Sequence, residues 1–537
     1  MTDLLPTQGI YATGTIASVE VREPAAPAVL TVTRLGETVS EHRVGAPGLV
    51  DLAGLAPGGY GVELAVDGVT VARTALEVSD RPRRSLRYGF VVDYRPGRDL
   101  AAVADNLRRL HLTGIQFYDW AYRHADLLGG GETYDDALGQ PVSLDTVRSL
   151  IATCHEVGAD ALGYAAVYAV GPQEWADWEH DALLTAGGVP YALGDFLFIV
   201  DPAAKDWLEH LRGELSAATE LVGFDGFHLD QYGYPKRALR PDGELVDVAE
   251  SFVAMIGGVR RQLPLARLVF NNVNDFPTWA TASADQDAVY VEVWTPNVGL
   301  EHLAEVVTRA RSAGAGKPVV VAAYQHVYDS APAEVSDLST ALTMATLFSH
   351  GATHLLCGEA DRILVDPYYV RNHLVEPSTA GLLRRWYDFL VEHVELLMPQ
   401  GIADVTGSYA GPYNDDLDVT YELAGVAEHA AAGSVWRRIT QVHDQLVVHL
   451  VNLTGQDDTL WDGPRHEPGS PGPGTLRIRR AGPALPRVRV ADPDRQARLV
   501  DVEVVADGDF ATATLPAPYL WQVVLVDPAG RSDRETR

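Results

Sequence analysis

The sequence is poor in cysteine, in long apolar runs and in positive charge. Only Cys154 and Cys357 occur among 537 residues, so no disulfide framework exists and the fold must depend on its hydrophobic core. No stretch approaches the roughly 18 consecutive apolar residues of a transmembrane helix. Lys and Arg number 42 against 73 Asp and Glu, a net charge of −31. Because such a chain repels polyphosphates and anionic lipids, the composition argues against nucleic-acid and membrane partners.

The N-terminal segment also lacks the features of a secretory signal. Residues 1–6 contain no basic region, and no apolar segment follows them. Together with the low cysteine content, this favours a cytoplasmic protein, although a secreted protein trimmed of its signal would look the same. Hydrophobic residues make up 47% and charged residues 21% of the chain, which is typical of globular proteins. The length predicts two to four domains.

The first 84 residues have the pattern of a small β-sandwich. Val62, Leu64 and Val66 occupy alternate positions, as they do in a strand with one buried face. Asp67-Gly68 then supplies a two-residue hairpin turn.

Residues 85–400 alternate apolar strands with amphipathic helices, for example 144–157 and 300–313. Eight such repeats predict a (β/α)8 TIM barrel. A doubly wound open sheet is the alternative, but it requires a Gly-rich phosphate turn after an early strand, and Arg95-Pro96-Gly97-Arg98 is not one. The eight predicted strands are Tyr88–Tyr94, Gly114–Trp120, Ala161–Ala169, Gly226–Asp230, Leu268–Asn274, Ala288–Trp294, Pro318–Tyr324 and Ala352–Gly358.

Strand patterns return in residues 401–537. The apolar runs Leu446–Val451 and Trp521–Val526 are typical strands, and Asp507-Gly508 is another hairpin turn. We therefore predict that residues 401–537 form a second all-β domain, a β-sandwich, and that the whole chain is a multidomain α/β protein.

The strand ends carry the candidate functional residues, since the carboxyl ends of the strands form the active-site face of a TIM barrel. Carboxylates, aromatics and amides predominate there, whereas clustered Lys/Arg for phosphates and clustered His/Cys for a metal are missing. Aromatic faces stack on sugar rings and amides bind hydroxyls, so a carbohydrate substrate is expected, with no metal and no organic cofactor. The candidates are Tyr118, Asp119, Trp120, His228, Asp230, Asn271, Glu292, Trp294 and Glu359.

Asp230 and Glu292 are the best pair for glycosidic cleavage, which needs two carboxyl groups. They end the fourth and sixth predicted strands, and strands two apart contribute to the same layer of a barrel. The alternative is that one of them only binds hydroxyls or forms a salt bridge. Alternation along the fourth strand places His228 and Asp230 inside and leaves Asp225 as a structural acid. His228 could contact substrate, orient Asp230, or simply be a packed, hydrogen-bonded histidine.

Other motifs exclude competing chemistries. Gly129-Gly130-Gly131 lacks the ending of a P-loop, and the chain has no G-x-S-x-G elbow of an α/β-hydrolase. His124, His155 and His228 lack the spacing of metal ligands.

Several segments resemble glycoside hydrolase family 66, which contains dextranases and cycloisomaltooligosaccharide glucanotransferases. The most specific one is the Gln-Phe-Tyr-Asp-Trp element at 116–120. The order and spacing of the matching segments extend over about 300 residues. They are 87–90, 116–120, 122–124, 223–226 leading to Asp230, 270–274, 292–294 and 387–390.

The resemblance implies a retaining hydrolase of α-1,6-glucan with Asp230 as nucleophile and Glu292 as acid/base. It implies that Asp119 is a carboxylate needed for activity, which we interpret as a ligand of substrate hydroxyls. It also implies an immunoglobulin-like domain before the barrel and a β-domain after it. The sequence departs from the family pattern at Leu229-Asp230-Gln231-Tyr232 and in the loop after His124, so substrate linkage and chain length are left open.

Hydrolysis is favoured over cyclisation, because no segment between the predicted strands has room for the carbohydrate-binding module that the glucanotransferases insert. A transglycosylase and a hydrolase of another α-linkage are the alternatives among enzymes. A non-catalytic carbohydrate-binding barrel is disfavoured by the facing acid pair. The sequence does not define the oligomeric state.

Overall fold

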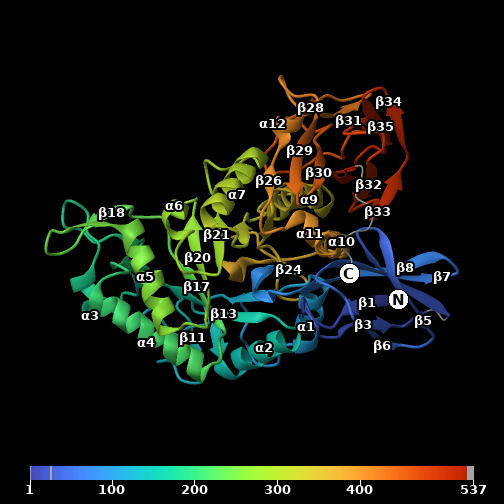
Figure 1. Ribbon diagram of the computed structural model, residues 1–537. Helices are drawn as coiled ribbons and strands as arrows, with labels where there is room; N and C mark the ends of the chain where they lie inside the picture. Colours follow the sequence, from blue (N-terminus) through green and yellow to red (C-terminus); the bar gives the residue numbers. More distant parts are fainter. Residues whose placement is uncertain (1, 25–26, 529–537) are drawn as a thin grey trace.

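Eight parallel strands form the centre of the computed structural model, which describes residues 2–24 and 27–528 (Figure 1). The strands pair in chain order, and all eight predicted strands are present. They are β9 (Tyr88–Val91), β10 (Gly114–Phe117), β13 (Asp160–Ala166), β17 (Gly226–Asp230), β20 (Arg267–Val273), β21 (Ala288–Glu292), β22 (Val319–Ala322) and β23 (Ala352–His354).

The barrel is nearly closed. Within the described residues no backbone ladder joins β23 to β9, but the Thr353 hydroxyl donates to the Leu86 carbonyl at 2.8 Å. Several strands end earlier than predicted: β10 ends at Phe117 and β23 at His354. The residues that follow, including Trp120 and Glu359, therefore belong to loops, where the inward–outward alternation of a strand no longer applies.

Helices follow the strands and cover the barrel. The predicted helix at 144–157 is α2, which begins where Ser143 accepts a hydrogen bond from the Thr146 amide, and its buried side chains recur at helical spacing. The helix predicted at 300–313 is α7. The main helices of this region are α1 (Leu100–Arg109), α2 (Leu144–Glu156), α4 (Lys205–Leu221), α5 (Val248–Gln262), α7 (Leu300–Gly314), α9 (Ala333–His350) and α10 (Pro377–Glu392).

Short elements lie in the loops beyond the strands and build up the mouth of the barrel. They include the hairpin-like pairs β11 (Thr133–Asp135) with β12 (Pro141–Ser143), β18 (Arg237–Leu239) with β19 (Leu245–Asp247), and β24 (Arg362–Ile363) with β25 (His373–Leu374). The others are β14 (Ala169–Val170), α3 (Trp175–Trp178), η2 (Glu179–Asp181), β15 (Ala192–Leu193), β16 (Leu197–Ile199), α6 (Thr278–Thr281), α8 (Val327–Ser330) and η3 (Tyr369–Arg371).

The N-terminal region forms two sheets around one core. Val62 and Leu64 face this core, and Asp67-Gly68 turns β7 into β8 with both residues at positive φ, as predicted. Its immunoglobulin-like topology and the boundary at residue 84 stay predictions. One sheet contains β1 (Asp3–Pro6), β3 (Ala17–Arg22) and β6 (Gly48–Leu52). The other contains β2 (Tyr11–Ala12), β8 (Val69–Ser79), β7 (Gly58–Val66), β4 (Ala28–Arg34) and β5 (Glu37–Val44). The short helix η1 (Pro82–Arg84) leads to the barrel.

The C-terminal region also forms two sheets around a shared core. The predicted runs at 446–451 and 521–526 lie in adjacent strands, β30 and β36. One sheet contains β26 (Ala403–Asp404), β28 (Val426–Ala427), β29 (Val435–Val442), β30 (Gln445–Asn452), β36 (Trp521–Asp527), β32 (Arg487–Asp492) and β33 (Gln496–Val502). The other contains β27 (Leu417–Tyr421), β31 (Gly474–Arg479), β35 (Phe510–Leu515) and β34 (Val504–Asp507); α11 (Val394–Leu397) and α12 (Thr406–Tyr409) precede them.

Both β-rich regions lie against the same side of the barrel, beside α10 and α9 (Figure 1). Buried polar contacts join the N-terminal sheets to α10: Asp388 accepts hydrogen bonds from Thr74 and is bonded to His111, at 3.2 and 2.8 Å. Across the part of the chain that the structure describes, no helix is both long and apolar enough to span a membrane.

Candidate active site

Asp230 is the last residue of β17 and lies at the mouth of the barrel. Two residues earlier on the same face, the His228 ring stacks on Tyr164 at 6.2 Å and meets Tyr290 edge-on at 4.8 Å, which places it inside the barrel. Phe227 points the other way and packs on Phe224. The alternation predicted for this strand is therefore present in the structure.

Asn271 joins the two candidate catalytic carboxylates. It lies on β20, which runs between β17 and β21, and Glu292 ends β21. The Asn271 Nδ2 donates to Asp230 Oδ1 and to Glu292 Oε2, in both cases at 2.7 Å. The two carboxylate oxygens that share this nitrogen are therefore no farther apart than twice 2.7 Å.

Tyr164 provides a second hydrogen bond to Asp230. Its hydroxyl donates to Asp230 Oδ2 at 2.7 Å, so each oxygen of this carboxylate accepts one hydrogen bond. Glu292 receives a hydrogen bond from Asn271, and the nearby side chains of Tyr324 and Trp294 oppose the rise in its pKa. Asn271, on the strand between the two acids, thus holds both of them, and Tyr164 on β13 also holds Asp230.

The pKa values of both carboxyls are raised above the ordinary range. For Asp230 the cause is burial, and the hydrogen bonds from Asn271 and Tyr164 oppose it. For Glu292 burial is again the largest cause, and the nearby Asp230 charge adds to it. Because two negative charges repel each other at this distance, the pair favours the singly protonated state, in which one acid is ionised and the other carries a proton.

Asp119 lies close to the pair without being held by it. Its φ of 43° is left-handed, and its side chain is 9% exposed. In the described part of the chain no hydrogen bond to its carboxylate is found, while burial and the charges of Asp136 and Asp230 raise its pKa well above the usual value. This carboxyl group is available to a polar ligand.

Aromatic side chains line the same space. Tyr118 stacks on Tyr369 with ring centres 4.2 Å apart, and Trp294, which is partly exposed, packs against Tyr324 at 5.7 Å. Sequence reasoning missed Tyr369, which comes from η3 in the long loop after β23. The adjacent pair Tyr368-Tyr369 in that loop was the available signal.

A cavity of about 490 Å³ opens between the loops at this end of the barrel. Its walls come from the segments after β10, β13 and β23, and they include Phe196 and Tyr368. The cavity is large enough for sugar rings and lies at the strand ends, where a barrel binds its ligands.

Trp120 and Glu359 require correction. Trp120 is fully buried, its Nε1 donates to the Tyr164 carbonyl at 3.1 Å, and it packs on Phe224, so it is a core residue. Glu359 is 4% exposed, forms an ion pair with Arg98 and accepts a hydrogen bond from the Val92 amide. Neither side chain is available to a substrate, because Trp120 is enclosed in the core and the Glu359 carboxylate is occupied by Arg98 and the Val92 amide.

His228 also differs from the prediction of substrate contact. It is 1% exposed and lies beneath the carboxylates, with Nδ1 3.2 Å from the Tyr88 hydroxyl and Nε2 4.0 Å from Asp230 Oδ1. Burial lowers its pKa to about 3, so it is neutral. Of the roles considered for His228, that of a packed, hydrogen-bonded histidine fits this geometry. No cluster of three or more potential metal ligands occurs in the described residues.

Comparison with known proteins places this site in a family. The model of glycosyl hydrolase family 66 matches residues 51–525. A cycloisomaltooligosaccharide glucanotransferase of Niallia circulans is 26% identical over 333 residues, which cover 57% of this chain and 34% of that protein. A dextranase of Streptococcus salivarius is 22% identical over 310 residues, covering 49% and 37%. The chain thus matches about a third of the length of these curated relatives.

A solved structure shares the whole fold. The cycloisomaltooligosaccharide glucanotransferase of Paenibacillus sp., in complex with cycloisomaltoheptaose, superposes with a TM-score of 0.85 at 17% identity, covering 98% of this chain and 100% of that chain. The family match extends across the barrel, most of the C-terminal β-rich region and the part of the N-terminal β-rich region from residue 51 onward. The chain belongs to glycosyl hydrolase family 66.

Proposed function

We propose that the enzyme is a retaining hydrolase of α-1,6-glucan, with Asp230 as nucleophile and Glu292 as acid/base. The observation that carries this proposal is the shared Asn271 amide, which holds one oxygen of Asp230 and one oxygen of Glu292 no farther apart than twice 2.7 Å. This closeness supports a retaining enzyme, in which the two carboxyl groups are about 5–5.5 Å apart. Inverting enzymes need a wider gap, because a water molecule must fit between the acid and the sugar.

The proposed reaction has two displacements. Asp230, ionised and held by Asn271 and Tyr164, attacks the anomeric carbon while protonated Glu292 gives its proton to the leaving glycosidic oxygen. A β-linked glycosyl-enzyme results. Glu292, now ionised, takes a proton from water, which attacks the same carbon and releases the sugar with its original α configuration.

In this proposal Asp119, Tyr118 and Trp294 bind the sugar. Asp119 accepts hydrogen bonds from hydroxyls, while the aromatic side chains contact the ring faces. Further sugar units would extend into the cavity beside Phe196 and Tyr368. The names of the curated relatives, a dextranase and glucanotransferases, support an α-glucan of the dextran type.

A glucanotransferase is the second candidate, and the structural similarity to such an enzyme supports it. The short connections between barrel strands favour hydrolysis. The longest of them, from Ala166 to Gly226, is filled by small strands and α4. Sizing of the products from dextran separates the two candidates: linear isomaltooligosaccharides support hydrolysis, and cyclic products support transfer.

Azide rescue tests the two catalytic roles. Glu292→Ala is given an α-glucosyl substrate whose leaving group needs no proton, so Asp230 still forms the glycosyl-enzyme. Azide needs no deprotonation, attacks from the α face and releases the α-glucosyl azide. In Asp230→Gly, azide enters from the opposite face and gives the β-azide directly.

The stereochemistry of each azide product is read by NMR on variants whose fold is verified by circular dichroism. A β-azide from Glu292→Ala would show that the two roles are reversed. Absence of rescue in both folded variants would contradict the assignment of this pair.

A further inference from the structure

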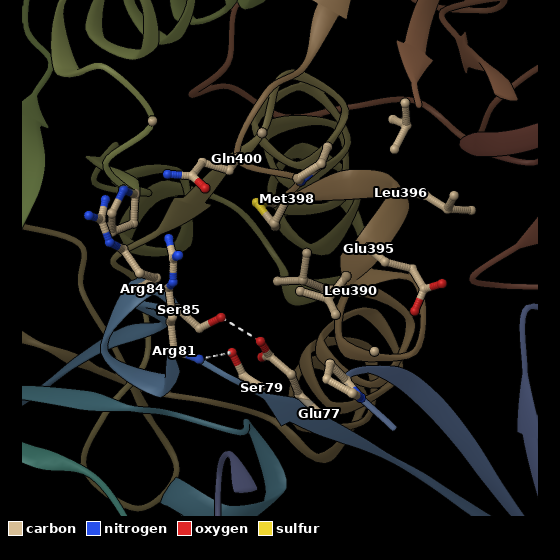
Figure 2. A pocket seen from close by; sticks show the side chains of 18 of the residues that line it. Glu77, Ser79, Arg81, Arg84, Ser85, Leu390, Glu395, Leu396, Met398 and Gln400 are labelled. Carbon is tan, nitrogen blue, oxygen red and sulfur yellow. Dashed lines mark hydrogen bonds between the residues drawn. The ribbon is translucent and has the colours of Figure 1, made fainter. Parts of the chain in front are cut away.

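A second cavity, of about 650 Å³, lies at the end of the barrel opposite the carboxylates (Figure 2). Leu86 precedes β9, and Val319 and Thr353 lie at the beginnings of β22 and β23, so this end carries the strand starts. The turn between β29 and β30 and the segment from Leu390 to Gln400 complete the wall. The cavity is therefore shared by the N-terminal sheets, the barrel and the C-terminal sheets.

Six cationic and three acidic side chains line this cavity. Two of the acids are already paired: Glu77 with Arg87, and Glu395 with Arg34 at 3.2 Å. Glu77 also accepts a hydrogen bond from Ser85, as Figure 2 shows. Apart from these two pairs, the cavity is lined by four cationic side chains and one exposed carboxylate, that of Asp80. The four cations are Arg81, Arg84, Arg311 and Lys317.

The four remaining cations have no carboxylate partner among the described residues. Arg311 donates only to the carbonyls of Gly351 and Pro399, and Lys317 only to two carbonyls of the 282–284 turn. Arg81 and Arg84 are exposed, and no side-chain hydrogen bond or ion pair joins either of them to another described residue. In Figure 2 both extend toward the side of the cavity where Gln400 lies.

In this chain of net charge −31 the buried arginines Arg87, Arg267 and Arg489 each form an ion pair with an acid, which the four cations of the cavity do not. Burial, as the largest cause, lowers the pKa of Arg311 to about 10. Burial also lowers the pKa of Lys317; the charges of Asp285 and Asp287 oppose this shift, and the Arg84 charge adds to it. Unpaired like charges around one cavity repel one another, and an anion bound among them would remove that repulsion.

The opposite wall is apolar, with Leu390, Val394, Leu396 and Met398. We propose that the cavity binds a small organic phosphate, with the phosphate on Arg81, Arg84 and Lys317 and the carbon skeleton against this apolar wall. Guanidinium groups match the geometry of phosphate oxygens, and a dianion fits the excess of cations better than a single carboxylate does. The volume is within the range of small-molecule sites and exceeds what inorganic phosphate would fill.

A ligand in this position contacts the N-terminal region through Arg81 and Arg84 and the barrel region through Lys317 and the apolar wall, in a cavity that the C-terminal sheets also line. It would therefore stabilise the assembled chain, because binding to the folded state alone raises its stability. The site lies at the opposite end of the barrel from Asp230 and uses none of the residues of the proposed reaction. Binding can thus be measured independently of enzymatic activity.

Calorimetric titration and thermal unfolding of the full chain test the proposal. The probes are phenyl phosphate, glucose 6-phosphate, inorganic phosphate and glucose, all at constant ionic strength. We expect one site per chain, an increase in Tm, and binding of at least one organic phosphate about tenfold tighter than inorganic phosphate. Glucose without phosphate should not bind here.

The double variant Arg81→Gln/Arg84→Gln should weaken this binding by about tenfold or more. Arg43→Gln is the matched control, since Arg43 is an exposed arginine of β5 that does not line the cavity. All three positions are exposed, so the variants should fold. No phosphate binding, equal affinity for organic and inorganic phosphate, or equal weakening by Arg43→Gln would overturn the proposal.

Discussion

The hydroxyl of Tyr164 donates to Oδ2 of Asp230 over 2.7 Å, from the strand that lies next to β17. The bond restrains the carboxylate from the side opposite Asn271, so Asp230 cannot rotate without losing a partner. A hydrogen bond of this kind favours the ionised acid and opposes the rise in pKa that burial causes. It therefore connects the geometry of the site to its dependence on pH.

Tyr164→Phe should lower kcat/KM by about 10- to 100-fold, since hydrogen bonds to charged groups contribute about 1.5–3 kcal/mol. The pKa of Asp230 should rise further in this variant. Because Asp230 must be ionised to attack, the acidic limb of the pH–rate profile should move to higher pH. Steady-state kinetics across pH measure both effects.

Tyr168→Phe is the control for this variant. The Tyr168 hydroxyl donates to the Tyr234 carbonyl and accepts from the Tyr232 amide, so its loss should reduce stability without moving the acidic limb. An acidic limb that shifts equally in both variants would contradict the role of Tyr164.

Asn271→Ala should lower kcat by about 100-fold or more, because the two carboxylates lose their shared donor. Both pKa values should rise, so the whole pH–rate profile should move to higher pH. The neighbouring Asn272 faces the other way and bonds the Tyr290 carbonyl. Asn272→Ala should therefore lower Tm and leave the pH profile in place; a shift there would show that the effect at Asn271 is not local.

Asp119→Asn should lose about 100-fold in kcat/KM without loss of stability. Asparagine tolerates the left-handed φ of this position, and no protein hydrogen bond to the carboxylate is broken. The pKa of Asp119 is higher in the folded protein than in the unfolded chain. Its protonation therefore stabilises the folded state at low pH, and this stabilisation is lost as the pH rises through the folded-state pKa. The difference in Tm between Asp119→Asn and the parent protein should therefore favour the variant more strongly at neutral pH than near pH 4. Unchanged kinetics would exclude a contact with substrate.

Glu359→Ala should act on stability rather than on catalysis. Removal of this acid deprives Arg98 of its buried partner, with Asp93 at 3.7 Å remaining, and leaves the Val92 amide without an acceptor. We expect a cost of about 3 kcal/mol in the free energy of unfolding. Denaturant unfolding measures this loss, and KM for the folded fraction should stay close to that of the parent. A large rise in KM with unchanged stability would show instead that Glu359 contacts the substrate.

Local sequence patterns determined the order of the elements and part of the site. Alternation with period two located the strands and placed His228 and Asp230 on one face, because successive side chains of a strand point to opposite faces. The Asp67-Gly68 turn was likewise readable, since it needs positive φ at both positions. Strand ends marked Asp230 and Glu292 as neighbours in the barrel.

Only the tertiary structure decided what lies beyond the strand ends. β10 ends at Phe117 and Asp119 is left-handed, so alternation no longer predicted that Tyr118 lines the site while Trp120 enters the core. The stacking of Tyr118 on Tyr369 and the bridge from Asn271 to two acids join residues far apart in the chain. Such contacts depend on distances in space between elements, which the local pattern of residues along the chain does not contain.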